Sequence, residues 1–470
     1  MTNPLYLKHY RASNFRDCEI ECLEVIASNP REFNPHLVLC VSLTRLNKNE
    51  EAVEKGLIAL EIVDATADLR ARQLDRLSDA IGYYRKAISL VPSRPEGLFA
   101  LAEALYANNE FDESREVFEL FFGLGDVPND LLPHALYTYS IMNSELDLQE
   151  FIARFPRLPR RVNHHLFFHG IGNLLIAQNE TESALKSYDL ANSLRRSTEP
   201  YSFETELEIF DLHLRYIAEE SLPISYDFPK SGRTPIFIVG MPRTGSSLLE
   251  QMLGAHSSIS PTGETGWLMQ ILRETLSVSS DSAAFFGGLR NLDNKDFVSQ
   301  LRANYFEKVS ILKSEYFIDK TLGNFQLLWL IKSAFPEATV LHSAREKGPT
   351  IWSCYKTSFK KGVRFSESLP EAATYFDKVE ELMSRWSQKP GSSPMRIQYE
   401  ELIENPERMV RRVLARLNLD FELDTLNPSR QIRIVNTASK VQVTKPIYKI
   451  PNKEFEPFRR LVETRISQNT

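Results

Sequence analysis

The stretch PIFIVGMPRTGSSLLEQML, residues 235–253, decides the fold of the second half of the chain. Its first part, Ile236 to Val239, is a continuous apolar run rich in β-branched residues, which predicts a buried strand of a parallel sheet. A break bounded by glycines follows at 240–245, and the leucine spacing over 246–253 predicts an amphipathic helix. A strand, such a loop and a helix N-terminus together form a phosphate cradle, because backbone N–H groups and the positive end of the helix dipole point at the anion.

The loop GMPRTGSS has the G-x-x-x-x-G spacing of a Walker A loop but lacks its lysine. Ser246 stands at that position, so a γ-phosphate would miss its usual positive charge, and ATP or GTP is a poor fit. The loop offers instead one cation, Arg243, and the hydroxyls of Thr244, Ser246 and Ser247. These residues predict a 5′-phosphate site on a nucleotide other than a triphosphate. The alternative interpretation is an ordinary connection between a strand and a helix.

The length, composition and net charge of the chain limit the classes of protein to which it can belong. With 470 residues, 42% of them hydrophobic and 25% charged, the chain is expected to form two to four globular domains. The net charge of −6 argues against a general surface for nucleic acid or acidic membrane. No apolar run is long enough to span a membrane and no signal peptide is recognised, so we expect a cytoplasmic protein. Cys18 and Cys22 are expected to be reduced core residues of a helix, and no ligand cluster for a metal is recognised.

Residues 1–225 have a helical pattern that repeats. Small or core residues recur 28 to 36 residues apart, with 34 recurring, at Cys18, Ala52, Ala80, Ser114, Leu148 and Ala184. This period resembles that of tetratricopeptide helix pairs, although the register over 121–165 is uncertain. Such repeats stack into a solenoid whose concave surface usually holds a peptide or a protein. The alternatives are that the helices support the other half of the chain or form a dimer.

After a proline-containing linker at 226–234, short apolar runs alternate with helical segments over 235–470. This alternation predicts an α/β domain with a mostly parallel sheet. We expect strands at 236–239, 316–318, 339–342 and 395–398. Because ligands of such sheets bind at the carboxyl ends of the strands, the loops that follow them are the places to look for a site.

Those loops carry polar residues suited to a second phosphate. Lys320 follows one expected strand, and Arg345 follows another, with Ser353 eight residues later on the next helix. An arginine and a serine so placed can converge on one dianionic phosphate, the arginine with two parallel hydrogen bonds. Tyr399 follows the last expected strand and offers an aromatic face for a base. Two phosphate sites in one Walker-like fold predict a nucleotide phosphorylated at both ends.

With these motifs in order, residues 232–470 resemble the sulfotransferases that use 3′-phosphoadenosine 5′-phosphosulfate (PAPS) and release 3′-phosphoadenosine 5′-phosphate (PAP). They resemble most the tyrosylprotein sulfotransferase branch and the bacterial proteins that fuse tetratricopeptide repeats to that domain. The resemblance implies a 5′-phosphosulfate loop, a 3′-phosphate pair, an adenine contact and a contact from the last loop. The 5′-phosphosulfate loop corresponds to Arg243, Thr244, Gly245, Ser246 and Ser247. The 3′-phosphate pair corresponds to Arg345 and Ser353, and the adenine contact to Tyr399. The contact from the last loop corresponds to Ser439 with Lys453, where Lys445 or Lys449 could replace Lys453.

The resemblance also implies a reaction, the transfer of a sulfuryl group from PAPS to an acceptor hydroxyl without a metal. Glu264, in Gly-Glu-Thr, would be the base; Lys320 would stabilise the transition state, and Ser439 would approach the sulfate. Glu264 could instead be a solvated loop carboxylate, and His256 and His342 are rival bases. Two departures from the family pattern are Arg-Glu-Lys-Gly-Pro at 345–349, where Arg-Asp-Pro is usual, and Phe455 in place of a tryptophan.

The acceptor is left open by the sequence. Resemblance to the tyrosylprotein branch favours a tyrosine of a peptide or protein, and sugars, lipids and small hydroxyl compounds are alternatives. Two other functions also remain open. One is a P-loop kinase of a small alcohol, and the other is a non-catalytic scaffold whose repeats bind a partner beside a relic nucleotide-binding domain.

Overall fold

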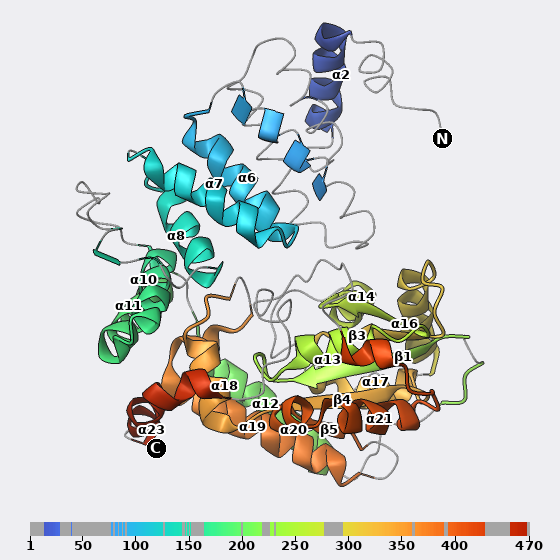
Figure 1. Cartoon of the computed structure of the whole chain (residues 1–470). Coiled ribbons are helices and arrows are strands. Elements are labelled where there is room, and N and C mark those ends of the chain that lie inside the picture. Colours follow the sequence, from blue (N-terminus) through green and yellow to red (C-terminus); the bar gives the residue numbers. More distant parts are fainter. Residues whose placement is uncertain are drawn as a thin grey trace. The chain divides into compact units, whose positions relative to one another are not determined.

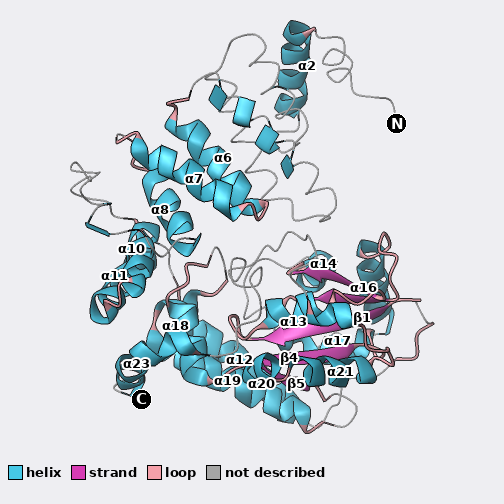
Figure 2. Ribbon diagram, viewed as in Figure 1, coloured by secondary structure: helices cyan, strands magenta, loops and turns pink. Residues whose placement is uncertain are grey.

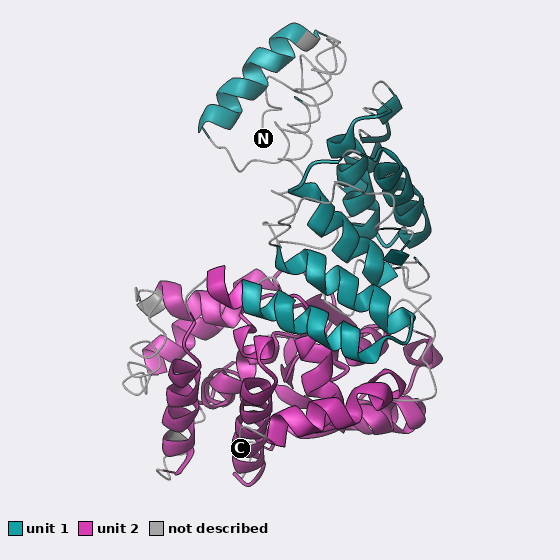
Figure 3. Cartoon of the chain, turned by 90° about the vertical axis from the view of Figure 1, so that its left-hand side faces the viewer, with its two compact units in different colours: residues 1–194 teal, residues 195–470 magenta. Residues whose placement is uncertain are grey.

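The structure is a computed structural model of the whole chain (Figure 1). It describes residues 14–28, 39, 77–78, 80–82, 84–86, 88–89, 92–125, 127–142, 146, 148–149, 151, 164–198, 201–218, 226–229, 232–276, 295–359, 362–389, 393–427 and 452–467. The chain forms two compact units, residues 1–194 and 195–470, which are coloured separately in Figure 3.

The first unit is helical in the part that is described. Its helices are α2 (Phe15–Ser28), α6 (Pro95–Ala107), α7 (Phe111–Gly123), α8 (Leu131–Met142), α10 (His165–Ala177) and most of α11 (Thr181–Thr198). Helices α6 and α7 form a packed pair, in which the buried Ser114 hydroxyl donates to the carbonyl of Ala102. Helices α10 and α11 also contact each other, since a Cβ on Gly172 would lie 2.7 Å from the Tyr188 ring. The expected helical N-terminal region is therefore confirmed.

Of the residues that recur in the expected repeat, Cys18, Ser114 and Ala184 lie in α2, α7 and α11. Cys18, Ala80, Ser114 and Ala184 are buried and Leu148 is half-buried, while Ala52 lies outside the described residues. Burial of a small residue at four of these positions is consistent with a 34-residue period. The stacking of such pairs into a solenoid stays a prediction.

The second unit begins earlier than the expected linker. Helix α12 (Phe203–Ala218) packs on α19 (Leu369–Ser387), where the Phe210 ring meets Tyr375 edge-on at 5.0 Å. The same ring stacks on Phe325 at 6.0 Å. The division between the compact units therefore lies after Leu194 and not near residue 225. The helical pattern of α12 gave no sign of this, because helical periodicity does not show which unit a helix packs against.

A five-stranded parallel sheet forms the centre of the second unit. The strands are β1 (Thr234–Gly240), β2 (Ile259–Gly263), β3 (Tyr316–Asp319), β4 (Thr339–Ala344) and β5 (Met395–Gln398), in the order β2-β3-β1-β4-β5. All four pairings are parallel. The expected parallel sheet and four of its strands are confirmed. Strand β2 was not expected, because its sequence ISPTG has the composition of a turn; as an edge strand it tolerates Pro261, which has no N–H to donate.

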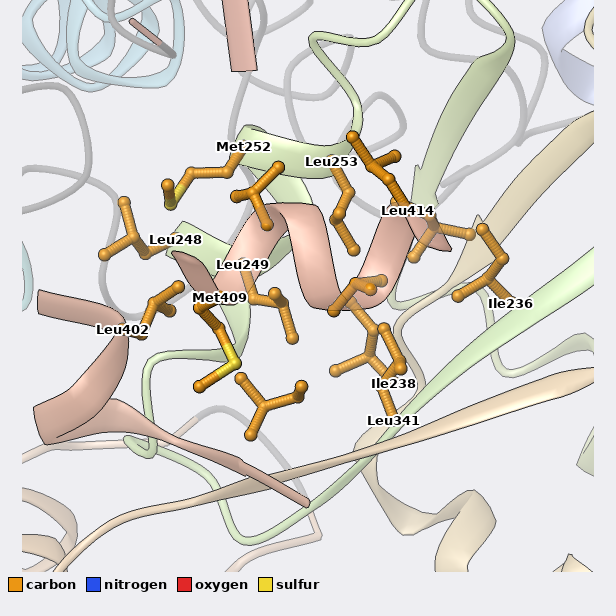
Figure 4. Packing of buried hydrophobic residues seen from close by; sticks show 14 of the residues in the cluster. Ile236, Ile238, Leu248, Leu249, Met252, Leu253, Leu341, Leu402, Met409 and Leu414 are labelled. Carbon is orange, nitrogen blue, oxygen red and sulfur yellow. The ribbon is translucent and has the colours of Figure 1, made fainter. Parts of the chain in front are cut away.

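Both faces of the sheet are covered by helices (Figure 2). Ile236, Ile238 and Leu341 point to one face and pack against α13 (Ser246–Leu253), α20 (Tyr399–Glu404) and α21 (Pro406–Arg416), as Figure 4 shows. The alternate residues, among them Phe237 and Phe317, meet Tyr305 of α16 (Lys295–Lys308) on the other face, where α17 (Leu328–Ala334) also contacts α16. Burial on both faces explains why β1 reads as a continuous apolar run.

The remaining elements complete the second unit. They are α14 (Trp267–Leu276), α18 (Lys347–Tyr355), α23 (Arg459–Ser467) and the 3₁₀ helices η2 (Leu322–Leu327), η3 (Arg364–Glu367), η4 (Leu423–Leu426) and η6 (Lys453–Phe458). The C-terminal segment 452–467 docks on α18, where Phe458 stacks on Trp352 with ring centroids 4.1 Å apart. Within the described residues, we find no helix with the length and apolar character needed to cross a membrane.

Candidate functional site

Four polar or aromatic residues stand directly after four of the strands. Glu264 follows β2, Lys320 follows β3, Arg345 follows β4 and Tyr399 follows β5. The loop 241–245 follows β1, which lies between β3 and β4. The chain builds the sheet outward from β1 in both directions, so this loop lies at the topological switch point where ligands of open parallel sheets bind. Glu264 and Lys320 come from one side of the loop, and Arg345 and Tyr399 from the other.

The loop after β1 has a strained backbone. Arg243 has φ of 67°, in the left-handed region that a residue with a side chain seldom adopts, and Gly245 has φ of 88°. Gly245 precedes α13 as its N-cap, and a Cβ at this position would lie 2.4 Å from Cδ2 of Tyr399. Glycine is therefore required twice at Gly245, by its backbone conformation and by the approach of the tyrosine ring.

The hydroxyls of the loop fall into two groups. Thr244 is buried; its Oγ1 lies 2.7 Å from the carbonyl oxygen of Met241, to which it donates, and 3.0 Å from the Ser343 hydroxyl. The structure thus turns Thr244 toward the loop's own backbone. Ser246 and Ser247 form the first turn of α13, and the N-terminus of a helix favours an anion through its backbone N–H groups and its dipole.

Two arginines and a serine meet beside the loop. Nε of Arg243 donates to the hydroxyl of Ser353 at 2.9 Å, and Nη1 of Arg345 donates to the carbonyl of Arg243 at 3.0 Å. The sequence assigned Arg243 to one phosphate and Arg345 with Ser353 to another, but the structure joins all three in one cluster. The carbonyl contact explains how the left-handed backbone of Arg243 is held.

The ring of Tyr399 packs against Arg345 of this cluster. The ring is 9% exposed and lies 4.6 Å from the guanidinium carbon of Arg345, a cation–π distance. Burial raises the pKa of the Tyr399 hydroxyl, and burial also lowers the pKa of Arg345. In this structure the ring supports Arg345 and the loop at Gly245; stacking of the ring on a base stays a prediction.

Asn452 completes the cluster, and sequence reasoning missed it. Its Oδ1 accepts from both Nε and Nη2 of Arg345, at 2.8 and 2.7 Å. The residue is 107 positions away from Arg345 in the chain, so no local pattern connects the two. The only signal in the sequence is its type, because asparagine adopts the left-handed conformation more readily than most residues, and Asn452 has φ of 63°.

On the other side of the loop, a buried lysine lies between two carboxylates. Lys320 is fully buried, and its Nζ donates to Oε1 of Glu264 at 2.6 Å and lies 3.9 Å from Oε2 of Glu250 on α13. The Glu264 side chain is 49% exposed, so it reaches from the buried ammonium to the solvent. Glu250 was not expected, although a glutamate within the apolar helix LLEQML was a signal for it.

The neighbouring Asp319 holds this arrangement from the other face of the sheet. Its carboxylate accepts from the Tyr305 hydroxyl at 2.7 Å, the Thr265 hydroxyl at 3.3 Å and the backbone N–H of Thr321 at 2.9 Å. Burial raises the pKa of Asp319, while these hydrogen bonds oppose the rise. Because successive residues of a strand point to opposite faces, fixing Asp319 directs Lys320 toward α13 and the loop.

Neither rival histidine is placed like a base for this site. Both ring nitrogens of His256 are engaged, by the carbonyl of Asp420 at 2.9 Å and the N–H of Ser258 at 3.1 Å. His342 is buried on the sheet face that bears α19, with Nε2 3.5 Å from Glu380. Burial lowers the pKa of His342 to about 3. These contacts favour a structural role for both histidines.

The last loop is described only in part. Lys453 is exposed at the start of η6, directly after Asn452. Ser439, Lys445 and Lys449 lie outside the described residues. Among the described residues, no group of three or more histidine, cysteine, aspartate or glutamate side chains is arranged to hold a metal ion.

Comparison with known proteins finds a family model and a curated relative that match this chain. Residues 235–423 match the model of the sulfotransferase family. An uncharacterized protein of Aquifex aeolicus (strain VF5) is 24% identical over 381 residues, which cover 79% of this chain and 50% of that protein. The chain therefore spans about half the length of this curated relative.

Solved structures similar to the chain include three sulfotransferases. The sulfotransferase domain of the curacin biosynthetic pathway is 17% identical, with a TM-score of 0.33, over 50% of this chain and 98% of that one. The sulfotransferase domain of the Synechococcus PCC 7002 olefin synthase is 16% identical, with a TM-score of 0.34, over 51% and 98%. Sulfotransferase STF1 of Mycobacterium tuberculosis H37Rv is 13% identical, with a TM-score of 0.32, over 69% and 99%.

Proposed function

We propose that the protein transfers a sulfuryl group from PAPS to an acceptor hydroxyl and releases PAP. The observation that carries this proposal is the cluster of Arg243, Arg345 and Ser353 next to a phosphate loop that has no Walker lysine. The family match over 235–423 supports the same reaction class. The site residues fit the nucleotide by their chemistry: cations, hydroxyls and helix N–H groups gather where a nucleotide with two separate phosphates needs them.

The 3′-phosphate would be held by Arg345 and Ser353. Arg345 is partly desolvated, and a guanidinium in such surroundings gains from an anion that accepts parallel hydrogen bonds. Arg243 lies between this pair and the loop, so its positive charge is available to both ends of the nucleotide. The first turn of α13, at Ser246 and Ser247, would receive the 5′-phosphate.

Transfer itself would take place near Lys320 and Glu264. In the reaction the acceptor oxygen forms a bond to sulfur as the bond from sulfur to the phosphate oxygen breaks, and the acceptor proton goes to a base. Glu264 is the exposed carboxylate nearest Lys320, so it can take that proton. Lys320 would stabilise the negative charge that grows on the leaving oxygen, as positioned cations do in phosphoryl transfer.

For the acceptor we propose a hydroxyl of a peptide or protein, with tyrosine peptides as the first to test. This choice is supported by the resemblance of the motifs to the tyrosylprotein sulfotransferase branch. The helical N-terminal unit would recruit the acceptor or a partner protein, as stacked helix pairs do. A cytoplasmic location is part of the same proposal.

The test is calorimetric titration of the purified protein with PAP, AMP and ATP. We expect PAP to bind at least about tenfold more tightly than AMP, because the 3′-phosphate adds charge-assisted hydrogen bonds. Arg345→Ala should remove most of that difference, and it should weaken AMP binding less than PAP binding, since Arg345 also holds the carbonyl of Arg243. The matched control is Arg411→Ala, since this exposed arginine stacks on Phe421 and pairs with Glu407 on the outer side of α21.

Equal binding of PAP and AMP by the unmodified protein would contradict the proposal. A preference for ATP would support the alternative function, a P-loop kinase of a small alcohol. Tight PAP binding without transfer from labelled PAPS to any acceptor would favour the scaffold.

A further inference from the structure

Arg345 lies among carboxylates that compete for its charge. Glu346 is its neighbour in the chain, and the negative charges of Glu400 and Glu454 act on the pKa of its guanidinium. A free arginine beside such groups forms a bidentate ion pair with one of them. Arg345 instead directs Nε and Nη2 to the neutral amide of Asn452.

The amide of Asn452 has chemically different partners at its two ends. Oδ1 faces the guanidinium of Arg345, which can only donate, and Nδ2 donates to Oε1 of Glu400 at 2.9 Å and to Oε2 of Glu346 at 3.3 Å. The carboxylates can only accept, so the partners fix the orientation of the amide. A carboxylate in its place could bind the arginine but would repel both glutamates.

The backbone holds this amide in place. Asn452 is 9% exposed and caps η6 with φ of 63°. The helix that it begins is anchored on α18, because Phe455 fills the space above Gly348 and Phe458 stacks on Trp352. The amide is therefore carried by a docked segment that lies beyond the region matched by the family model.

We propose that Asn452 is a positioning residue of the nucleotide site, which holds Arg345 and separates it from Glu346 and Glu400. An arginine has five N–H donors, and contacts among the described residues engage three of those on Arg345, two with Asn452 and one with Arg243; the other two are proposed to receive a phosphate. Because the amide of Asn452 is neutral, its contact with Arg345 does not neutralise the positive charge of the guanidinium. This inference rests on the proposed function, because it names a residue that prepares the same site for the 3′-phosphate.

The test compares Asn452→Asp and Asn452→Gly with the unmodified protein in titrations with PAP and AMP. Both replacements tolerate the left-handed backbone, so the fold should be kept. In Asn452→Asp the new carboxylate neutralises Arg345, and in Asn452→Gly the glutamates can reach it. We expect the preference for PAP over AMP to fall about tenfold or more in each, the size of a lost charge-assisted contact.

A rescue experiment distinguishes the positioning of Arg345 by Asn452 from a merely structural role of Asn452. Adding Glu346→Gln and Glu400→Gln to Asn452→Gly should restore part of the preference for PAP, because the competing charges are gone. The control is Asn418→Asp, since Asn418 is an exposed asparagine with φ of 55° at the end of α21. It makes the same change of charge on the same backbone conformation and should leave the preference unchanged.

The outcomes distinguish this inference from the proposed function. If the unmodified protein does not prefer PAP, the proposed function fails. If it does, and both variants at 452 keep the preference within about twofold, the positioning role is overturned while the function stands. Tighter binding of PAP by Asn452→Gly would also overturn it, by showing that the amide occupies the place of the phosphate.

Discussion

At the scale of single residues, the loop after β1 is shaped by steric limits. The left-handed backbone of Arg243 places its carbonyl against Arg345, and that of Gly245 lets the chain pass the Tyr399 ring. Such conformations cost about 1–3 kcal/mol each for residues with side chains. Left-handed conformations occur here at two positions next to the cluster of Arg243, Arg345 and Ser353. This is consistent with a loop whose shape is held by contacts with Arg345 and Tyr399.

Gly245→Ala tests this shape. The added methyl group would strain the backbone and meet Tyr399 at 2.4 Å, so we expect a loss of at least about 2 kcal/mol in the free energy of unfolding and weaker binding of PAP. Denaturant unfolding and calorimetry measure the two effects. Gly232→Ala is the matched control, because Gly232 has φ of 72° and a methyl group added there would have no atom within 4 Å. Equal losses for both variants would show that the tyrosine contact does not matter.

At the scale of elements, β4 shows a buried histidine within a strand and a candidate site residue directly after the strand's end. Arg345 directly follows the strand at the sheet edge, while His342 is buried within it, facing α19. The Glu380 carboxylate lies 3.5 Å from His342, but it is paired with Arg396 at 2.6 Å. The histidine therefore gains little from that carboxylate, and burial together with Arg396 lowers its pKa to about 3.

This low pKa predicts a dependence of stability on pH. The unfolded chain protonates His342 near its ordinary pKa of about 6.5, whereas the folded chain does so only near 3. Between these values the unfolded state binds more protons, so the free energy of unfolding falls as the pH falls below about 6.5. From pH 6.5 to pH 5 this one residue should contribute about 2 kcal/mol of the loss.

Urea unfolding of the protein and of His342→Gln at pH 7.5 and pH 5 measures this contribution. The variant should lose about 2 kcal/mol less on acidification, by the same linkage. His213 on α12, whose pKa burial lowers to about 4, contributes with the same sign and remains in both proteins. An equal loss in the two proteins would mean that the folded chain protonates His342 as readily as the unfolded chain.

At the scale of the whole molecule, the second unit includes helix α12 and the residues just before it. Arg195 pairs with the buried Glu367 at 3.1 Å, and Arg196 forms a bidentate pair with Glu371 at the start of α19. Phe210 of α12 is fully buried against Phe325 and Tyr375. The helical half of the sequence thus supplies part of the core of the unit that contains the sheet.

A fragment of residues 195–470 should therefore fold and bind PAP, whereas a fragment of residues 226–470 should be much less stable. Loss of Phe210 alone removes about 3–5 kcal/mol, and loss of Arg195 leaves Glu367 with one fewer cation. Thermal unfolding and PAP titration of the two fragments measure the difference. Phe210→Ala in the full chain controls for the effect of shortening. Equal melting temperatures of the fragments would place the boundary at the linker instead.

The sequence by itself determined the loop between β1 and α13, four of the five strands and the residues that follow them, including Lys320, Arg345 and Tyr399. These features depend on local patterns, such as an apolar run, a glycine or a charge at a strand end, and parallel strands bring their carboxyl ends to one edge. Glu264 was recognised only through its motif, because the turn-like composition of β2 hid the strand before it.

Only the tertiary structure decided which partners these residues have. It turned the Thr244 hydroxyl inward, joined Arg243 to Ser353, and brought Asn452 to Arg345 across 107 residues. It also assigned α12 to the unit that contains the sheet. Hydrogen bonds and packing contacts between distant segments depend on how whole elements dock, and a pattern that repeats over a few residues carries no information about that docking.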